Sequence, residues 1–265
     1  MSTNPKNPPP AASVVLCVLN GEECLPRALD SIFAQTFADF EAIVVDDGST
    51  DATAEILAGY AAREPRLRVL RHARNEGIPK SLNDGIAAAR APLILRADAD
   101  DYNFPGRFAL QVAFMREHPE VDVLGGAMER ADSRGRVFSV TSQPATNAGI
   151  QRRLYLRVPF FHPTVALRKA FWERHGGYST RWPHCEDADL WLRAHKGATY
   201  ANLPDILVRY HAPRTLRHSR QLEVFRMLLA NGKRNGELHR ALLAIAKFTA
   251  ATFWFKVFPS KYFAP

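Results

Sequence analysis

Three aspartates, Asp98, Asp100 and Asp101, lie within four consecutive positions directly after an apolar run. Carboxylates at this density repel one another unless a cation or solvent lies between them. An EF-hand calcium loop starting at Asp98 would need glycine at its sixth position and glutamate at its twelfth, where this chain has Asn103 and Ala109. Two carboxylates spaced two apart at a strand end instead suit Mg²⁺ or Mn²⁺ bound together with a diphosphate. A solvated cluster at a helix start is the alternative.

A second acidic group ends another apolar run, in "VVDDGSTD". Asp46 and Asp47 close the run, Gly48 permits a tight turn, and the next three residues are of types that cap helix N-termini. This pattern indicates either a nucleotide pocket, in which a carboxylate accepts hydrogen bonds from base or ribose, or an ordinary strand-to-helix turn. A dinucleotide-binding fold would need G-x-G-x-x-G after its first strand. The turn "LNGEECLPRA" has a single glycine, which argues against that fold.

A third acidic pair, Glu186 and Asp187, opens a predicted helix after "RWPHC". The helix dipole favours negative charge at this end, so the pair is either structural or chemical. An alcohol is a poor nucleophile until a base removes its proton, and a positioned carboxylate contributes about 10²–10⁴-fold to such a reaction. The pair therefore offers two candidate carboxylates for such a base.

The elements that must position these acids alternate between two periods over the first hundred residues. Strand-like runs cover 13–19, 40–47, 66–72 and 91–100, and helical spacing lies between them. Strands that alternate with helices predict an α/β fold with a mostly parallel sheet, buried on both faces. Ligands bind such sheets at the carboxyl ends of the strands, where the first two acidic groups fall.

The pattern is mixed after residue 120. "VDVLGGAME" and "ILVRYH" are strand-like, "PFFHPTVALRKAFWERHGGY" holds a short strand and a helix, and "EDADLWLRAH" is helical. From about residue 215 every segment is helical. We therefore expect a disordered tail over 1–11, one domain over 12–213, and a C-terminal helical extension over 214–265.

Composition adds a basic surface to this outline. The chain has 265 residues, 46% of them hydrophobic, and a formal net charge of +8. The region 209–240 is rich in arginine and lysine, which attract phosphate in a nucleotide or an anionic lipid. No nucleic-acid reading module accompanies it, so we expect no nucleic-acid partner. The aromatic and lysine-containing segment 244–263 predicts either an interfacial membrane helix or a helix packed on its own domain.

The three cysteines, Cys17, Cys24 and Cys185, form no C-x-x-C motif and indicate neither a disulfide framework nor a zinc site. The proline-rich start lacks the apolar core of a secretory signal. A cytoplasmic location follows as an expectation, with peripheral contact at the inner face of the membrane.

Five segments resemble, in order and spacing, the family 2 glycosyltransferases of the GT-A (Rossmann-like) fold. They are "VVLCVLNGEECLPRALDSIFAQTF", "FEAIVVDDGSTDAT", "RNEGIPKSLNDGIAAAR", "LRADADDYNFPGRFALQ" and "EDADLWLR", and the resemblance covers about residues 12 to 212. It implies a GT-A domain whose mostly parallel sheet is flanked by helices.

The resemblance also implies roles for matching residues. The D-x-D element is Asp98-Ala99-Asp100, whose two acids hold a Mg²⁺ or Mn²⁺ ion, and the catalytic base is Asp187. The remaining nucleotide-sugar contacts that it implies are Leu19, Glu22, Asp46, Asp47, Arg74, Asn75, Gly77, Lys80, Arg209 and His211.

Acceptor contacts follow less directly. Trp182, in a predicted loop, is placed to stack on a sugar, and Glu186 lies beside the base, whereas Trp191 fits the core and His162 a structural hydrogen bond. The expected activity is inverting, metal-dependent transfer from a nucleotide sugar, most simply a UDP-sugar, to a glycan or lipid-linked saccharide in cell-surface polysaccharide synthesis.

Two alternatives stay open at this stage. A sugar-nucleotide nucleotidyltransferase would carry a G-x-G-x-R loop after its first strand, which "LNGEECLPR" does not supply. A non-catalytic nucleotide-sugar-binding scaffold commonly loses one of its acids, whereas Asp98, Asp100 and Asp187 are all present here.

Overall fold

The computed structural model describes residues 8–132, 134–156, 159–211 and 221–257, the last seven of these by backbone alone. The strands are β1 (Ala12–Val18), β2 (Phe40–Asp46), β3 (Leu67–Arg71), β4 (Leu93–Arg96), β5 (Tyr102–Asn103), β6 (Val123–Ala131), β7 (Val137–Thr141), β8 (Ala166–Arg168) and β9 (Tyr200–His211). The helices are α1 (Leu25–Phe33), α2 (Thr53–Arg63), α3 (Ile78–Ala88), α4 (Arg107–Glu117), α5 (Asn147–Arg153), α6 (Lys169–Arg174), α7 (Glu186–Ala194), α8 (Gln221–Asn235) and α9 (Leu238–Val257), with a 3₁₀ turn η1 (His162–Thr164).

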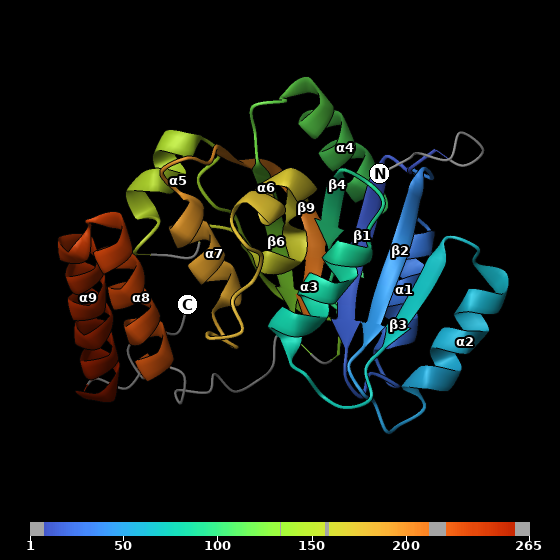
Figure 1. The fold of residues 1–265 in the computed structure, drawn as a ribbon. Helices are drawn as coiled ribbons and strands as arrows, with labels where there is room; N and C mark the ends of the chain where they lie inside the picture. Colours follow the sequence, from blue (N-terminus) through green and yellow to red (C-terminus); the bar gives the residue numbers. More distant parts are fainter. Residues whose placement is uncertain (1–7, 133, 157–158, 212–220, 258–265) are drawn as a thin grey trace.

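The described strands form one mixed sheet in the order β3-β2-β1-β4-β8-β6-β9-β5, with β7 paired to β6. The first half is parallel throughout, from β3 to β4. The short strand β8 runs antiparallel to both β4 and β6, whereas β9 is parallel to β6. Figure 1 shows this sheet at the centre, α2 at one end, and the α8–α9 pair at the other beside α7. This is the α/β architecture that the sequence predicts.

Both faces of the sheet are buried, because successive side chains of a strand point to opposite faces. In β1, Val14 and Leu16 pack into one apolar cluster with residues of α1, α2 and α4. Val15, from the same strand, packs into a second cluster that contains residues of α3, α7, α8 and α9. The second cluster joins the C-terminal helices to the sheet domain, so α8 and α9 are packed against the rest of the chain.

The predicted elements are found with small shifts in their bounds. The strand expected over 91–100 ends at Arg96, which leaves Asp98, Asp100 and Asp101 in the turn beyond β4. Trp191 is fully buried, and His162 accepts or donates a hydrogen bond at 2.9 Å to the hydroxyl of Tyr178, as expected for a structural histidine.

The ends of the chain are described only in part. Outside the described residues lie 1–7 of the predicted tail, 212–220 at the boundary between the predicted domain and the predicted extension, and 258–265 of that extension. Within the described part, no helix is both long enough and apolar enough to cross a bilayer.

Candidate active site

A cavity of about 450 Å³ opens where the carboxyl ends of β1, β2 and β4 meet. We call it the donor cavity. Its lining includes seven of the predicted residues, namely Leu19, Asp47, Asn75, Gly77, Asp98, Ala99 and Asp100. The parallel half of the sheet therefore brings residues from four separate segments of the sequence to one opening.

Asp47 fixes the loop that contains Asn75 and Gly77, which forms one wall of the donor cavity. Its carboxylate accepts the main-chain N–H groups of Glu76 and Gly77, each at 2.9 Å, and faces the Nδ1 atom of His72 at 2.7 Å. Burial alone would raise the pKa of Asp47, but these hydrogen bonds outweigh it and lower the pKa. Asp47 is thus ionised and fixes the loop that carries Asn75.

Gly48 is required by the same loop. Its φ is +79°, and an added Cβ would lie 2.6 Å from the carbonyl carbon of Arg74. A side chain there would be strained and would push the loop away from the turn. The neighbouring Asp46 is buried, accepts the N–H of Ser49 at 2.9 Å, and pairs with Arg71 at 3.3 Å. Asp46 therefore shapes the turn from within, and it is absent from the lining of the donor cavity.

The acidic turn lies on the opposite side of the donor cavity. One oxygen from each of Asp98, Asp100 and Asp101 falls within 4.8 Å of the others. Burial, reinforced by the neighbouring Asp98, raises the pKa of both Asp100 and Asp101. The buried Arg96 forms an ion pair with Asp98 and supplies part of the compensating charge.

These acids fit a divalent cation by their chemistry. The donor set consists of oxygen atoms alone, which suits Mg²⁺ or Mn²⁺. The Oδ2 atom of Asp101 is buried without a hydrogen-bond partner, and burial together with the charge of Asp98 raises the pKa of Asp100 and Asp101. Such an ion usually binds only one or two protein carboxylates and completes its shell with phosphate and water. Asp98 and Asp100 are the residues that would hold it.

The candidate base lies in the first turn of α7. Asp187 accepts the N–H of Ala188 at 2.7 Å. Burial raises its pKa, an effect opposed by that N–H and by Arg96. The adjacent Glu186 is also buried, and burial together with the charge of Asp187 raises its pKa as well. Two carboxyl groups held this close cannot both be readily ionised, so Glu186 retains its proton more easily than a free glutamate does.

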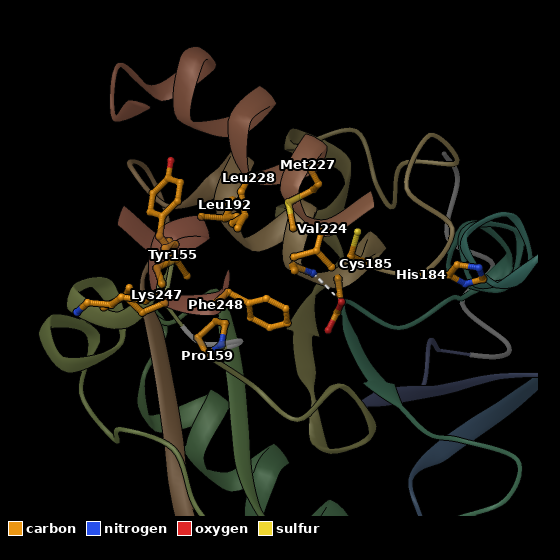
Figure 2. A pocket seen from close by; sticks show the side chains of 15 residues that line it. Tyr155, Pro159, His184, Cys185, Leu192, Val224, Met227, Leu228, Lys247 and Phe248 are labelled. Atoms are coloured by element: carbon orange, nitrogen blue, oxygen red, sulfur yellow. Dashed lines mark hydrogen bonds between the residues drawn. The ribbon is translucent and has the colours of Figure 1, made fainter. Parts of the chain in front are cut away.

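Asp187 borders a second cavity, of about 640 Å³, which we call the helical cavity. It lies between α7 and the C-terminal helices, and Figure 2 shows Leu192, Val224, Met227 and Phe248 around it. His184 borders both the helical cavity and the donor cavity. The loop before α7 therefore separates the two spaces.

Glu22, Arg74 and Lys80 are among the predicted donor contacts that lie outside the lining of the donor cavity. Glu22 accepts the N–H of Ala52 at 3.0 Å at the start of α2. Arg74 is 82% exposed and pairs with Glu76, while Lys80 pairs with Asp84 on α3. Their predicted nucleotide contacts stay predictions.

Arg209 and His211 of β9 lie beside the acidic turn instead. The N–H of His211 donates to Oδ1 of Asp101 at 2.9 Å. Arg209 forms an ion pair with Glu129 and lies over the ring of Tyr102. Both residues border a small cavity of about 80 Å³, separate from the donor cavity.

Trp182 requires a correction. It is only 7% exposed and belongs to the core cluster that contains Trp191, and Arg181 covers its ring at 4.9 Å. The ring is buried because the loop before α7 folds onto the core, so it offers no open face to a sugar. Polar loop residues around the tryptophan had masked this packing in the sequence.

Sequence reasoning missed two cationic residues of the site. Arg96 ends β4 and lies in the wall of the donor cavity beside Asp98. Arg27, on α1, donates to the main-chain carbonyl of Asp100 at 2.6 Å and so braces the acidic turn. An arginine two residues before D-x-D was a visible signal for Arg96, whereas nothing in the sequence joins Arg27 to the acids.

The family model described as Glycosyl transferase family 2 matches residues 13–176. The chain belongs to this family. EpsE of Bacillus subtilis (strain 168) is 34% identical over 194 residues, which are 71% of this chain and 67% of that protein. The amylovoran biosynthesis glycosyltransferase AmsE of Erwinia amylovora is 32% identical, over 76% of each chain. An Escherichia coli relative, UDP-Gal:alpha-D-GlcNAc-diphosphoundecaprenol beta-1,3-galactosyltransferase, is 29% identical over 69% of this chain and 67% of its own.

Solved structures share the fold of this glycosyltransferase. The structure of S. aureus TarS 1-349 in complex with UDP-GlcNAc superposes with a TM-score of 0.71 at 24% identity, over 95% of this chain and 74% of that one. A Pyrobaculum calidifontis mannosyltransferase in complex with GDP-Man and Mn²⁺ gives 0.65 at 18% identity, over 95% and 76%. The TM-scores establish a common GT-A fold, and identities below 25% support no conclusion beyond the fold. With the family assigned, the nucleotidyltransferase alternative is set aside.

Proposed function

We propose that this glycosyltransferase moves a sugar from a UDP-sugar to a hydroxyl of a lipid-linked saccharide or glycan, with inversion at the anomeric carbon. One observation carries the proposal. The donor cavity has the Asp47 loop on one wall and the Asp98–Asp100 turn on another, and it shares His184 with the helical cavity that contains Asp187. Sites for a nucleotide, a diphosphate and a base are therefore neighbours.

The reaction follows from this order of groups. The acceptor oxygen attacks the anomeric carbon, and Asp187 takes the hydroxyl proton as the bond forms. The bond between the anomeric carbon and the phosphate oxygen breaks, and its electron pair leaves with the nucleoside diphosphate. Attack from the side opposite the leaving group inverts the anomeric centre. The raised pKa of Asp187 suits this task, because a stronger base accepts the proton more readily.

A divalent ion held by Asp98 and Asp100 would neutralise negative charge on the departing diphosphate. Arg96 acts from the protein itself, since its guanidinium lies in the cavity wall next to Asp98. The Asp47 carboxylate orders the loop against which the nucleotide would lie.

The choice of donor and acceptor rests on relatives. The E. coli relative uses UDP-Gal and a diphosphoundecaprenol-linked acceptor, and AmsE serves amylovoran biosynthesis. The first supports a UDP-sugar donor and a lipid-linked acceptor, and the second supports a role in polysaccharide synthesis. We further propose that the protein works at the cytoplasmic face of the membrane. The basic residues of α8, among them Arg226 and Arg234, support contact with that anionic surface.

Calorimetric titration of UDP, with and without Mn²⁺, tests the donor site. We expect Mn²⁺-dependent binding that Asp100→Ala abolishes, because this substitution removes one of the two carboxylates that would hold the ion. Asp205→Ala, at an exposed aspartate of β9, is the matched control and should bind UDP normally. Mn²⁺-dependent binding of equal strength in Asp100→Ala would refute the assigned ion site. Binding of GDP or dTDP in place of UDP would refute the assigned donor.

A further inference from the structure

The helical cavity has a composition unlike that of a sugar-binding surface. Its walls come from α7, α8 and α9 and from the segment after α5, and most of its lining is aliphatic or aromatic. Figure 2 shows Leu192, Met227 and Leu228 on one side and Pro159 and Phe248 on the other. A glycan needs hydrogen-bond partners for its hydroxyl groups, and a wall of this kind offers few. Its chemistry matches a hydrocarbon.

The cavity also borders the reaction centre. Asp187, the candidate base, is the acidic residue in its lining, and His184 borders both this cavity and the donor cavity. An occupant of the helical cavity would therefore lie next to the hydroxyl that is to be deprotonated. A molecule that fills both places at once is an acceptor with an apolar chain.

The helix at the outer part of the cavity also exposes apolar side chains. Leu242 and Leu243 of α9 are each 52% exposed, as in a helix that lies against a membrane surface.

We propose that the helical cavity binds the hydrocarbon chain of a lipid-linked acceptor, whose saccharide end extends past Asp187 toward the donor cavity. This inference rests on the proposed function and deepens it, because it names the acceptor as lipid-linked and assigns its hydrocarbon chain to a site on the protein. The volume of about 640 Å³ is within the range of roughly 300–1,000 Å³ that is usual for small-molecule sites.

The test uses the full chain saturated with UDP and Mn²⁺. The probes are farnesyl phosphate and isopentenyl phosphate, which share a headgroup and differ in chain length, and inorganic phosphate serves as the headgroup alone. We expect farnesyl phosphate to bind at least about tenfold more tightly than isopentenyl phosphate. Inorganic phosphate should bind more weakly than both.

Variants at Val224 test whether the hydrocarbon chain of the probe lies in the helical cavity. Val224→Trp fills the cavity from α8, and Val224→Asp puts a charge into it with little added bulk. Both should remove the advantage of the longer chain while leaving UDP affinity and the far-ultraviolet circular dichroism spectrum unchanged. Leu222→Trp is the matched control, since this residue of α8 is 67% exposed and lies outside the cavity lining. It should retain the advantage.

Two results would overturn the inference. One is equal binding of the two prenyl phosphates, and the other is an undiminished advantage in both Val224 variants. Loss of UDP binding in the unmodified protein would instead count against the proposed function, so the two failures are distinguishable.

Discussion

Replacing Asp47 with asparagine tests whether an ordered loop is needed for donor binding. The two carboxylate oxygens of Asp47 accept the N–H groups of Glu76 and Gly77 at 2.9 Å each. Asparagine keeps the shape but has one acceptor oxygen and an amide that donates. Whichever way the amide is turned, one of the two N–H groups would meet a donor.

The size of the effect follows from the lost bond. A hydrogen bond to a charged group contributes about 1.5–3 kcal/mol. The Asp47 side chain is 6% exposed, so solvent recovers little of this loss. About 2 kcal/mol spent on ordering the loop corresponds to a UDP affinity roughly 30-fold weaker, at about 1.4 kcal/mol per factor of ten.

Calorimetry with UDP and Mn²⁺ measures the affinity, and a thermal melt checks the fold. Asp51→Asn is the matched control. Asp51 accepts the N–H groups of Glu22 and Thr53 at 3.1 and 3.0 Å in the same turn, but it lies outside the lining of the donor cavity. Its UDP affinity should stay within about threefold of the wild type. A folded Asp47→Asn protein with wild-type affinity would refute the role given to the loop.

Three further outcomes are expected. Asp187→Asn should lower turnover by about 10²–10⁴ while sparing UDP binding, measured by transfer of radiolabelled sugar; unchanged turnover would remove Asp187 as the base. Because burial raises the pKa of Asp187, turnover should fall as pH drops through this raised pKa; a pH–rate profile that stays flat on its acid side contradicts this role. Glu223 accepts the N–H of His184 at 3.0 Å, so Glu223→Ala should lower both the melting temperature and kcat. Glu223→Gln keeps an acceptor oxygen and should restore both values. Failure of this rescue would exclude the hydrogen bond as the cause.

The parallel half of the fold could be predicted because its strands are unbroken apolar runs. Periodicity located β1 and β2, and the rule that ligands bind at strand ends brought Asp47 and Asp98 together. The antiparallel strand β8 has three residues, too few to show a period, so its insertion between β4 and β6 was not predictable.

Long-range packing limited the prediction of the site. Trp182 is expected from the sequence to lie in a loop open to a sugar, yet it is buried through contacts with the core that local sequence does not record. The helical cavity has the same origin. It exists because Val224 and Phe248, from helices late in the chain, come to lie beside Asp187.

The contact between α7 and α8 has a consequence for cooperativity. Asn231 donates to Asp189 at 2.9 Å, and Asn235 donates to the carbonyl of Leu192 at 2.8 Å, both as buried bonds. Lys196 then donates to the carbonyl of Asn235 at 2.6 Å. Detaching α8 would leave these polar groups unpaired, so α7 and α8 open together in one subglobal unit. Amide protons of α7, the helix that contains Asp187, should then exchange with solvent at the rate at which the α8–α9 pair detaches.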